Sequence, residues 1–257
     1  MTDQASFLLY LWSHRAVYLG ASPENDLHKH HAAQLCVGLE APLRVREATN
    51  TEWLQTRAVL VPPDRPHEVD AGTGAIFTIY WEPESDDYPF KELGASLRTF
   101  PLSTEAVSVL ASIGDAPADP SDVWTRCVSA LGLQTYRAPE AIDPRVAVVL
   151  ERIRQSSEQP HTLGSLATAV HLSPSRLSHL FSAQVGVALR RFIVWSRVRQ
   201  AVRHALAGAN LTQAAVAAGF SDAAHMSHSF RGMFGFAPSA LFAHGINRRV
   251  FVVDDVA

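Results

Sequence analysis

Histidines that could bind a metal ion lie in two short stretches of the first third of the chain. His28 and His30 flank Lys29 in the first stretch, Gln34 follows four residues after His30, and His67 comes after a proline-rich turn. Imidazole nitrogens suit zinc, iron, nickel and copper, so the three histidines, with Gln34 as a further ligand, could hold one divalent ion. The same side chains could instead line a pocket for an organic effector or lie exposed on a loop.

A second set of candidate residues belongs to an imperfect internal repeat in the C-terminal half. The copies read LATAVHLSPSRLSHLF at 166–181 and AAVAAGFSDAAHMSHSF at 214–230, and each contains Ser-His-x-Phe with a glycine five residues later. The start of the repeat recurs after 48 residues and its end after 49, so one residue is inserted near the turn. A short helix rich in small residues, a tight turn and a polar N-cap before a second helix are typical of a helix-turn-helix. A helical bundle that merely reflects duplication is the alternative.

On these residues, the segment from about 142 to 245 resembles the DNA-binding domain of AraC/XylS-type transcription regulators. The resemblance implies two helix-turn-helix subdomains joined by a long helix, Ala188–Leu206, that insert recognition helices into successive major-groove segments on one face of DNA. It further implies a sequence-specific transcription factor, an activator rather than a repressor, with RNA polymerase and a second copy of the chain as partners. The matching residues are Leu166-Ala167, Leu172-Ser173-Pro174-Ser175-Arg176-Leu177, Phe181, Gly186, Arg197, Ala201, Ala218-Gly219-Phe220-Ser221-Asp222, Phe230-Arg231, Phe234-Gly235 and Pro238.

The resemblance carries base-reading positions over to the polar and small side chains of each second helix, which can meet base edges in the major groove. The alanines of the second copy depart from the commoner arginine, glutamine or tryptophan and offer only methyl contacts. Arginines nearby are candidates for phosphate contacts, although Arg197 could equally brace the two subdomains. The base-reading candidates are Ser175, Ser178, His179, Ala223, Ala224 and His228, and the phosphate candidates are Arg176, Arg190, Arg197, Arg199 and Arg231.

The two histidine stretches resemble the two motifs of a cupin β-barrel, the usual effector-binding and dimerisation module in front of AraC-type domains. The resemblance implies that His28, His30, Gln34 and His67 bind a small-molecule effector, with a divalent metal as the other expectation. A metal-binding cupin has a glutamate where this chain has Gln34. His31 should face away from the others because successive strand residues alternate between faces. A metal-dependent cupin enzyme with a helical appendage is the rival function.

Composition is consistent with a regulator and offers little support for an enzyme. Residues 1–140 hold 10 Lys and Arg against 19 Asp and Glu, whereas residues 141–257 hold 12 Arg, no Lys and 6 acidic residues. An acidic half joined to a basic half indicates two domains, of which the basic one suits a polyanion such as duplex DNA. No Ser-His-Asp, paired-carboxylate or phosphate-loop arrangement stands out, so we expect no enzyme. Without a long apolar run or a secretory signal, we expect a cytoplasmic protein with no membrane association.

Local patterns predict the elements that position these residues. Short β-branched and aromatic runs separated by turn signals indicate strands in the first part of the chain, and helical spacing begins after Pro83. The expected strands are Phe7–Trp12, Arg15–Leu19, Ala33–Leu39, Leu43–Arg46, Arg57–Val61 and Ala75–Trp81. The expected helices are Phe90–Leu97, Ser103–Ile113, Val123–Tyr136, Pro144–Ser157, Thr162–Val170, Ser173–Val185, Ala188–Leu206, Thr212–Ala218, Asp222–Phe234 and Pro238–His244.

These elements predict an α+β protein of two domains. Residues 1–137 should form a cupin-like β-barrel with following helices, which binds the effector and dimerises. Residues 142–250 should form an all-α domain with two helix-turn-helix units, reached through a proline-containing linker at 138–144. The helices at 103–113 and 123–136 could pair between two subunits or pack on their own barrel.

Overall fold

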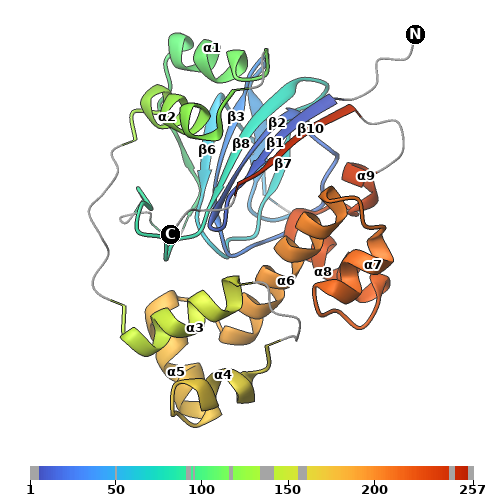
Figure 1. Ribbon diagram of the computed structural model, residues 1–257. Helices are drawn as coiled ribbons and strands as arrows, with labels where there is room; N and C mark the ends of the chain where they lie inside the picture. Colours follow the sequence, from blue (N-terminus) through green and yellow to red (C-terminus); the bar gives the residue numbers. More distant parts are fainter. Residues whose placement is uncertain are drawn as a thin grey trace. The chain divides into compact units, whose positions relative to one another are not determined.

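The computed structural model describes residues 6–49, 51–90, 94, 96–115, 118–133, 142–155, 161–242 and 247–253 (Figure 1). The chain divides into two compact units, which are described separately. One unit consists of Met1–Arg137 together with Arg231–Ala257, and the other of Ala138–Phe230. The first is rich in sheet and the second is helical, which confirms the predicted α+β class.

Two sheets form the first unit. The larger has seven strands in the order β10-β1-β2-β8-β3-β6-β9, and the smaller has the order β5-β4-β7. The predicted closed barrel is wrong for the described strands, because the larger sheet has two edges, at β10 and β9, that pair with no further strand. The strands are β1 (Ser6–Leu11), β2 (Arg15–Ala21), β3 (Ala33–Gly38), β4 (Leu43–Arg46), β5 (Leu54–Thr56), β6 (Ala58–Val61), β7 (Glu68–Asp70), β8 (Ala75–Trp81), β9 (Arg98–Thr99) and β10 (Asn247–Val252).

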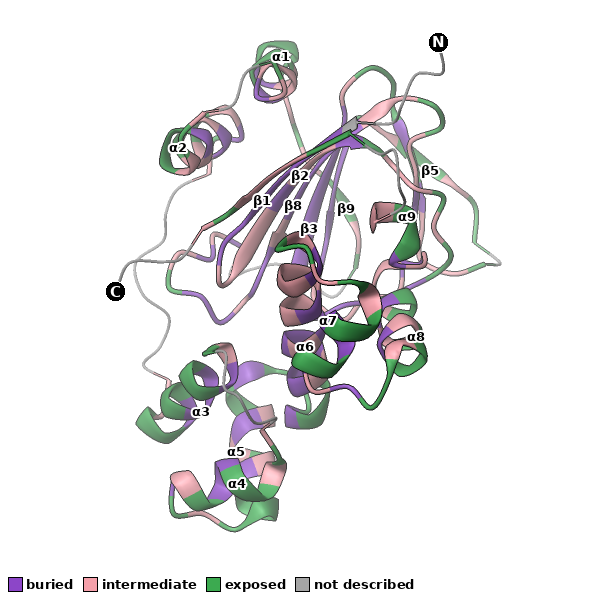
Figure 2. Cartoon of the chain, turned by 45° about the vertical axis from the view of Figure 1, so that its right-hand side comes forward, coloured by how far each residue is buried: buried purple, intermediate pink, exposed green. Residues whose placement is uncertain are grey.

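Strand β3, which pairs with β8 and β6, is buried along its whole length because apolar groups cover both of its faces (Figure 2). Leu35 and Val37 join a cluster with residues of α1 (Thr104–Ser112) and α2 (Pro120–Ala130). Cys36 belongs to a separate cluster with Val45 and Val69 of the smaller sheet. Gln34 lies two residues from Cys36 and therefore on the same side of the strand.

The C-terminal strand β10 is an element that the sequence did not predict. It runs parallel to β1, with Ser6 opposite Asn247 and Leu11 opposite Val252. The rings of Tyr10 and Phe251 stack with centroids 4.7 Å apart. The segment that follows the helical unit in sequence thus returns to the first sheet and covers the edge of β1, which would otherwise expose unpaired backbone groups.

The helices of the second unit follow the predicted spans closely. Asp143, Thr162, Ser173 and Asn210 cap the first turns with side-chain oxygens, as their residue types favour. These helices are α3 (Pro144–Arg154), α4 (Leu163–Ala169), α5 (Pro174–Val185), α6 (Leu189–Leu206), α7 (Leu211–Ala217) and α8 (Ala223–Phe234). Helix α8 crosses into the first unit after Phe230, and α9 (Ser239–Phe242) follows there.

Three predicted segments need correction or lie beyond the description. The helix expected at 90–97 is wrong for the described residues there, which are not helical, while 91–93 and 95 lie outside the described residues. Helix α2 begins at Pro120 rather than Val123, because Asp119 caps it, and ends at Ala130. Most of the linker expected at 138–144 falls outside the described residues. None of the described helices combines the length and the apolar character that crossing a membrane requires.

Candidate functional site

The two helix-turn-helix units use the same backbone devices. In the first, His171 adopts a left-handed conformation (φ 54°), and the N–H of Leu172 donates to the carbonyl of Ala167 at 3.0 Å. In the second, Gly219 takes that conformation (φ 83°), and the N–H of Phe220 donates to Ala215 at 2.9 Å. The left-handed residue reverses the chain after the first helix, as it does at many helix C-termini.

The residue inserted in the second copy is Ser221. In the first unit the cap follows the apolar residue directly, and Ser173 accepts the N–H of Arg176 through its side chain. In the second unit the cap comes one residue later, because Asp222 accepts the N–H of His225 at 2.7 Å. This shift explains why the repeat changes from a separation of 48 to one of 49 residues.

Removing either cap should destabilise its helix. Ser173→Ala and Asp222→Ala should each lower the free energy of unfolding by about 1 kcal/mol, since an N-terminal N–H loses its acceptor. Chemical denaturation followed by circular dichroism measures the change. The matched control is Ser221→Ala, which removes an exposed hydroxyl that contacts the Asp222 carboxylate but accepts no helix N–H, and it should cost less than about 0.5 kcal/mol. Equal losses for Ser221 and Asp222 would show that the cap has been assigned to the wrong residue.

The second helices α5 and α8 bury one face and expose the other. Leu177 and Phe181 on α5 are fully buried, and the Phe181 ring packs against Phe192 of α6 at 5.4 Å. Met226 and Phe230 anchor α8 in the same way. The predicted base-reading residues occupy the other faces: Ser175, His179, Ala224 and His228 are exposed, while Ser178 and Ala223 are half-buried.

The candidate phosphate-binding arginines do not share one environment. Arg176 on α5, Arg190 on α6 and Arg231 on α8 are exposed, as phosphate contacts require. Arg197 is half-buried and donates to the carbonyl of His161 at 3.2 Å, and burial lowers the pKa of its guanidinium. This bond favours the bracing role for Arg197. Arg199 is half-buried as well.

In the first unit, the structure brings together the three histidines that the sequence singled out. His28 and His67 form an antiparallel bridge in which each backbone N–H donates to the other's carbonyl, at 2.9 and 2.8 Å. Their ring centroids lie 4.2 Å apart, and the ring of His30 lies 5.1 Å from that of His67. One ring nitrogen from each histidine lies within 4.8 Å of the other two. We call these residues, with Gln34, the histidine cluster.

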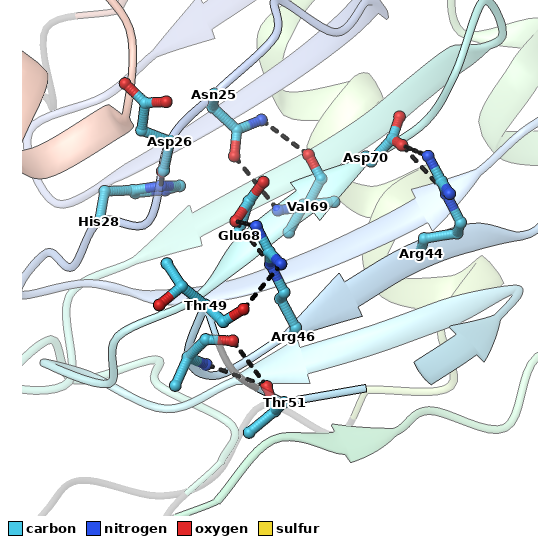
Figure 3. A network of polar contacts seen from close by, with 11 residues as sticks. Asn25, Asp26, His28, Arg44, Arg46, Thr49, Thr51, Glu68, Val69 and Asp70 are labelled. Atoms are coloured by element: carbon cyan, nitrogen blue, oxygen red, sulfur yellow. Dashed lines mark hydrogen bonds and ion pairs between the residues drawn. The ribbon is translucent and has the colours of Figure 1, made fainter. Parts of the chain in front are cut away.

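Polar contacts fix the segment that leads into His28 (Figure 3). The Asn25 side chain donates to the carbonyl of Val69 at 2.7 Å and accepts the N–H of Val69 at 3.2 Å. On the same strand, Glu68 forms an ion pair with Arg46 of β4 at 2.6 Å. These bonds hold the first histidine stretch against β7, close to where the second stretch ends.

Burial keeps the histidine cluster neutral. It lowers the pKa of His30 to about 3 and lowers that of His28, with the mutual repulsion of charged rings adding to the effect at His30. The pKa of His67, which is completely buried, falls well below its usual value for the same two reasons. Neutral imidazoles each keep one nitrogen lone pair free to bind an ion or a hydrogen-bond donor.

The sequence did not indicate all neighbours of the cluster. Tyr80 pairs directly with Gln34 across β3 and β8, and its ring lies 5.2 Å from that of His30. Phe234, in the part of the chain that belongs to the first unit, lies 6.1 Å from the His30 ring. The alternation of residues along β8 could have shown which face Tyr80 occupies. Only the pairing of β3 with β8, however, shows that this face carries Gln34.

His31 is not part of the cluster, as predicted, although the reason differs: it lies in a bend before β3 and pairs with Glu84. Its Nε2 lies 2.8 Å from a carboxylate oxygen of Glu84, and the two side chains are only 4% and 2% exposed. Burial alone would lower the pKa of His31, but the adjacent Glu84 carboxylate outweighs it and raises the pKa. The pair is therefore a buried ion pair next to the cluster and not part of it.

Comparisons with known proteins support the helix-turn-helix units and the fold. Residues 166–244 match the model of the Helix-turn-helix domain family. No curated protein matches the chain. Among solved structures, an apo variant of ToxT from Vibrio cholerae strain SCE256 covers 91% of this chain and 98% of that chain, with a TM-score of 0.61 and 11% identity.

Two further structures of ToxT from Vibrio cholerae show the same likeness. One, from strain O395, covers 89% of this chain and 97% of that chain, with a TM-score of 0.57 and 12% identity. The other is wild-type ToxT with an unsaturated fatty acid bound, which covers 97% and 100%, with a TM-score of 0.55 and 11% identity. At these identities the likeness establishes the fold. The helix-turn-helix units predicted from the sequence are thereby confirmed: residues 166–244 match a helix-turn-helix domain family, and the chain has the fold of ToxT.

Proposed function

We propose that this protein is a transcription regulator that reads duplex DNA with α5 and α8 and responds to a small ligand bound at the histidine cluster. The observation that carries the proposal is the pair of equivalent helices, each capped at its N-terminus, anchored by one buried face and exposed on the other. A helix of this kind fits the major groove, where its N-terminal side chains meet base edges. The proposal assigns no catalysis to the chain.

The ligand acts on DNA binding through the covalent continuity of the chain. Phe234 and Gly235, which lie against the cluster, follow closely on the part of α8 that carries Ala224 and His228. A ligand regulates only if it binds one arrangement of the protein more tightly than another. The cluster consists of imidazoles and an amide, so we assign it a polar ligand or an ion rather than the fatty acid seen in one ToxT structure.

We further propose that the regulator acts as a homodimer and contacts RNA polymerase. Two copies gain affinity and specificity by binding two half-sites of one operator, because the second contact becomes intramolecular. Activation rather than repression follows the resemblance to AraC-type regulators.

Binding to duplex DNA at several salt concentrations tests the proposal as a whole. The DNA flanking the protein's own gene is the first probe, and footprinting defines the site. The logarithm of the affinity should fall linearly with the logarithm of the salt concentration, because each neutralised phosphate releases counterions. A salt-independent interaction, or no protected site on any duplex, would refute a role in reading DNA.

His179→Ala should weaken binding to the specific site by about 1–3 kcal/mol and leave binding to random DNA nearly unchanged. The exposed His179 ring lies on α5, where it can donate to or accept from a base edge. Fluorescence anisotropy with both duplexes measures the two affinities. The control is His171→Asn, which removes an exposed histidine outside the recognition helix and keeps a residue type that tolerates φ of 54°. A loss of equal size on both duplexes would show that His179 is not a base reader.

A further inference from the structure

The rings of the histidine cluster are oriented alike by backbone carbonyls. The Nδ1 atoms of His28, His30 and His67 lie 2.8 Å from the carbonyl oxygens of Asp26, Ala32 and Arg65, respectively. A carbonyl oxygen only accepts hydrogen bonds, so each Nδ1 carries the proton and each Nε2 presents a lone pair. Histidines that bind metals are held in this way, with the second ring nitrogen donating to a carbonyl or carboxylate.

The side chain of Gln34 brings a fourth acceptor to the same place. Its Oε1 lies 2.9 Å from Nε2 of His30 and 2.7 Å from Nε2 of His67, while its Nε2 donates to the sulfur of Cys36 at 3.0 Å. Lone pairs that face each other at these distances repel unless a proton or a cation lies between them. If the Gln34 amide were turned round, its two N–H groups could satisfy the Nε2 atoms of only two of the three rings. Within the described residues no hydrogen bond reaches Nε2 of His28.

We propose that Nε2 of His28, His30 and His67 and Oε1 of Gln34 bind one divalent transition-metal ion. This inference deepens the ligand part of the proposed function by naming the class of ligand. Three nitrogens and one neutral oxygen suit zinc, iron, cobalt, nickel or copper. They do not suit calcium or magnesium, which take oxygen ligands. Tetrahedral coordination places ligand atoms about 3.4 Å apart, and one ring nitrogen from each histidine already lies within 4.8 Å of the other two.

The surroundings exclude water from the site. His30 and His67 are 2% and 0% exposed, and His28 is 6% exposed. Gly235, in the segment that covers His28, accepts the N–H of Asp26 at 2.9 Å. A Cβ at Gly235 would lie 2.4 Å from the carbonyl oxygen of Asp26 and 2.8 Å from Nδ1 of His28, so only glycine allows this approach.

Metal binding by the tag-free, full-length chain tests the inference. After treatment with a chelator, the protein is dialysed against zinc and, in parallel, against cobalt, calcium or magnesium, and bound metal is determined by elemental analysis. We expect one zinc or cobalt ion per chain, a cobalt spectrum typical of nitrogen and oxygen ligands, and no retained calcium or magnesium. His67→Ala and His28→Ala should each weaken zinc binding more than about 100-fold. His171→Asn, which removes an exposed histidine, should leave binding unchanged.

Gln34 distinguishes the metal site from a purely hydrogen-bonded network. Gln34→Glu should tighten zinc binding at least tenfold, because a carboxylate is a stronger ligand than an amide, and Gln34→Leu should weaken it. If the amide instead donates N–H groups to the rings, Gln34→Glu will destabilise the protein and no variant will bind metal. Circular dichroism establishes whether each variant folds. If His67→Ala does not fold, Gln34→Glu and His28→Ala still test the metal site. No bound zinc in the native chain, or zinc binding unaffected by the cluster variants, overturns the inference. Either result leaves metal-free DNA binding, measured separately, as an independent test of the regulator.

Discussion

His31→Leu should lower the free energy of unfolding by about 3–5 kcal/mol. The substitution removes the cationic partner of Glu84, whose carboxylate lies 2.8 Å from the imidazole and is only 2% exposed. The carboxylate then remains in the interior without the imidazolium of His31, and breaking a buried pair from one side costs this much. Leucine approximates the volume of histidine, so little of the loss comes from a cavity. Denaturant titration of the full-length chain at neutral pH measures it.

Two further variants separate the ion pair from general disturbance of the core. The double variant His31→Leu/Glu84→Leu removes both charges and should recover most of the lost stability, because no unpaired group is left to desolvate. Arg44→Ala breaks an exposed ion pair with Asp70 and should cost at most about 1 kcal/mol. A double variant as unstable as His31→Leu would show that the pair is not the cause.

The sequence predicted elements well where a local signal determines them. Asp143 and Ser173 predict the starts of their helices, because a capping side chain and the helix that it caps are neighbours in sequence. No such local signal determines whether a barrel closes or whether β10 forms. Whether sheets close, and whether β10 pairs with β1, depends on residues far apart in the chain, and the sequence Asn-Arg-Arg-Val-Phe-Val begins with polar residues. A pattern limited to one segment cannot supply that information.

In the candidate sites, too, the sequence predicted which residues matter but not how they contact one another. Residue type and spacing singled out His28, His30, Gln34 and His67, and the structure brings them together. Spacing could not show that each Nδ1 donates to a backbone carbonyl, since this requires the bridge between His28 and His67. Nor could it show that Arg197 donates to the carbonyl of His161, a bond that favours a bracing role over a phosphate contact.

Replacing Arg176, Arg190 and Arg231 together by alanine should weaken DNA binding more than about 100-fold at moderate salt. Each of these exposed guanidinium groups lies on or beside a recognition helix, and a hydrogen bond to a charged group contributes about 1.5–3 kcal/mol. The plot of log affinity against log salt should also become shallower by about 3, since each lost phosphate contact removes about 0.9 from the slope. Anisotropy titrations over a range of salt concentrations give both quantities.

The arginine variant should behave unlike His179→Ala, because phosphates carry no sequence information. Specific and random duplexes should lose affinity by the same factor, so their ratio stays constant, whereas His179→Ala should reduce that ratio. Arg152→Ala, which removes an exposed arginine from α3, is the matched control and should alter neither the affinity nor the slope. If the triple variant keeps the native slope, these arginines do not touch phosphates. The contacts to DNA phosphates must then come from other groups, such as the backbone N–H donors at the N-termini of α5 and α8.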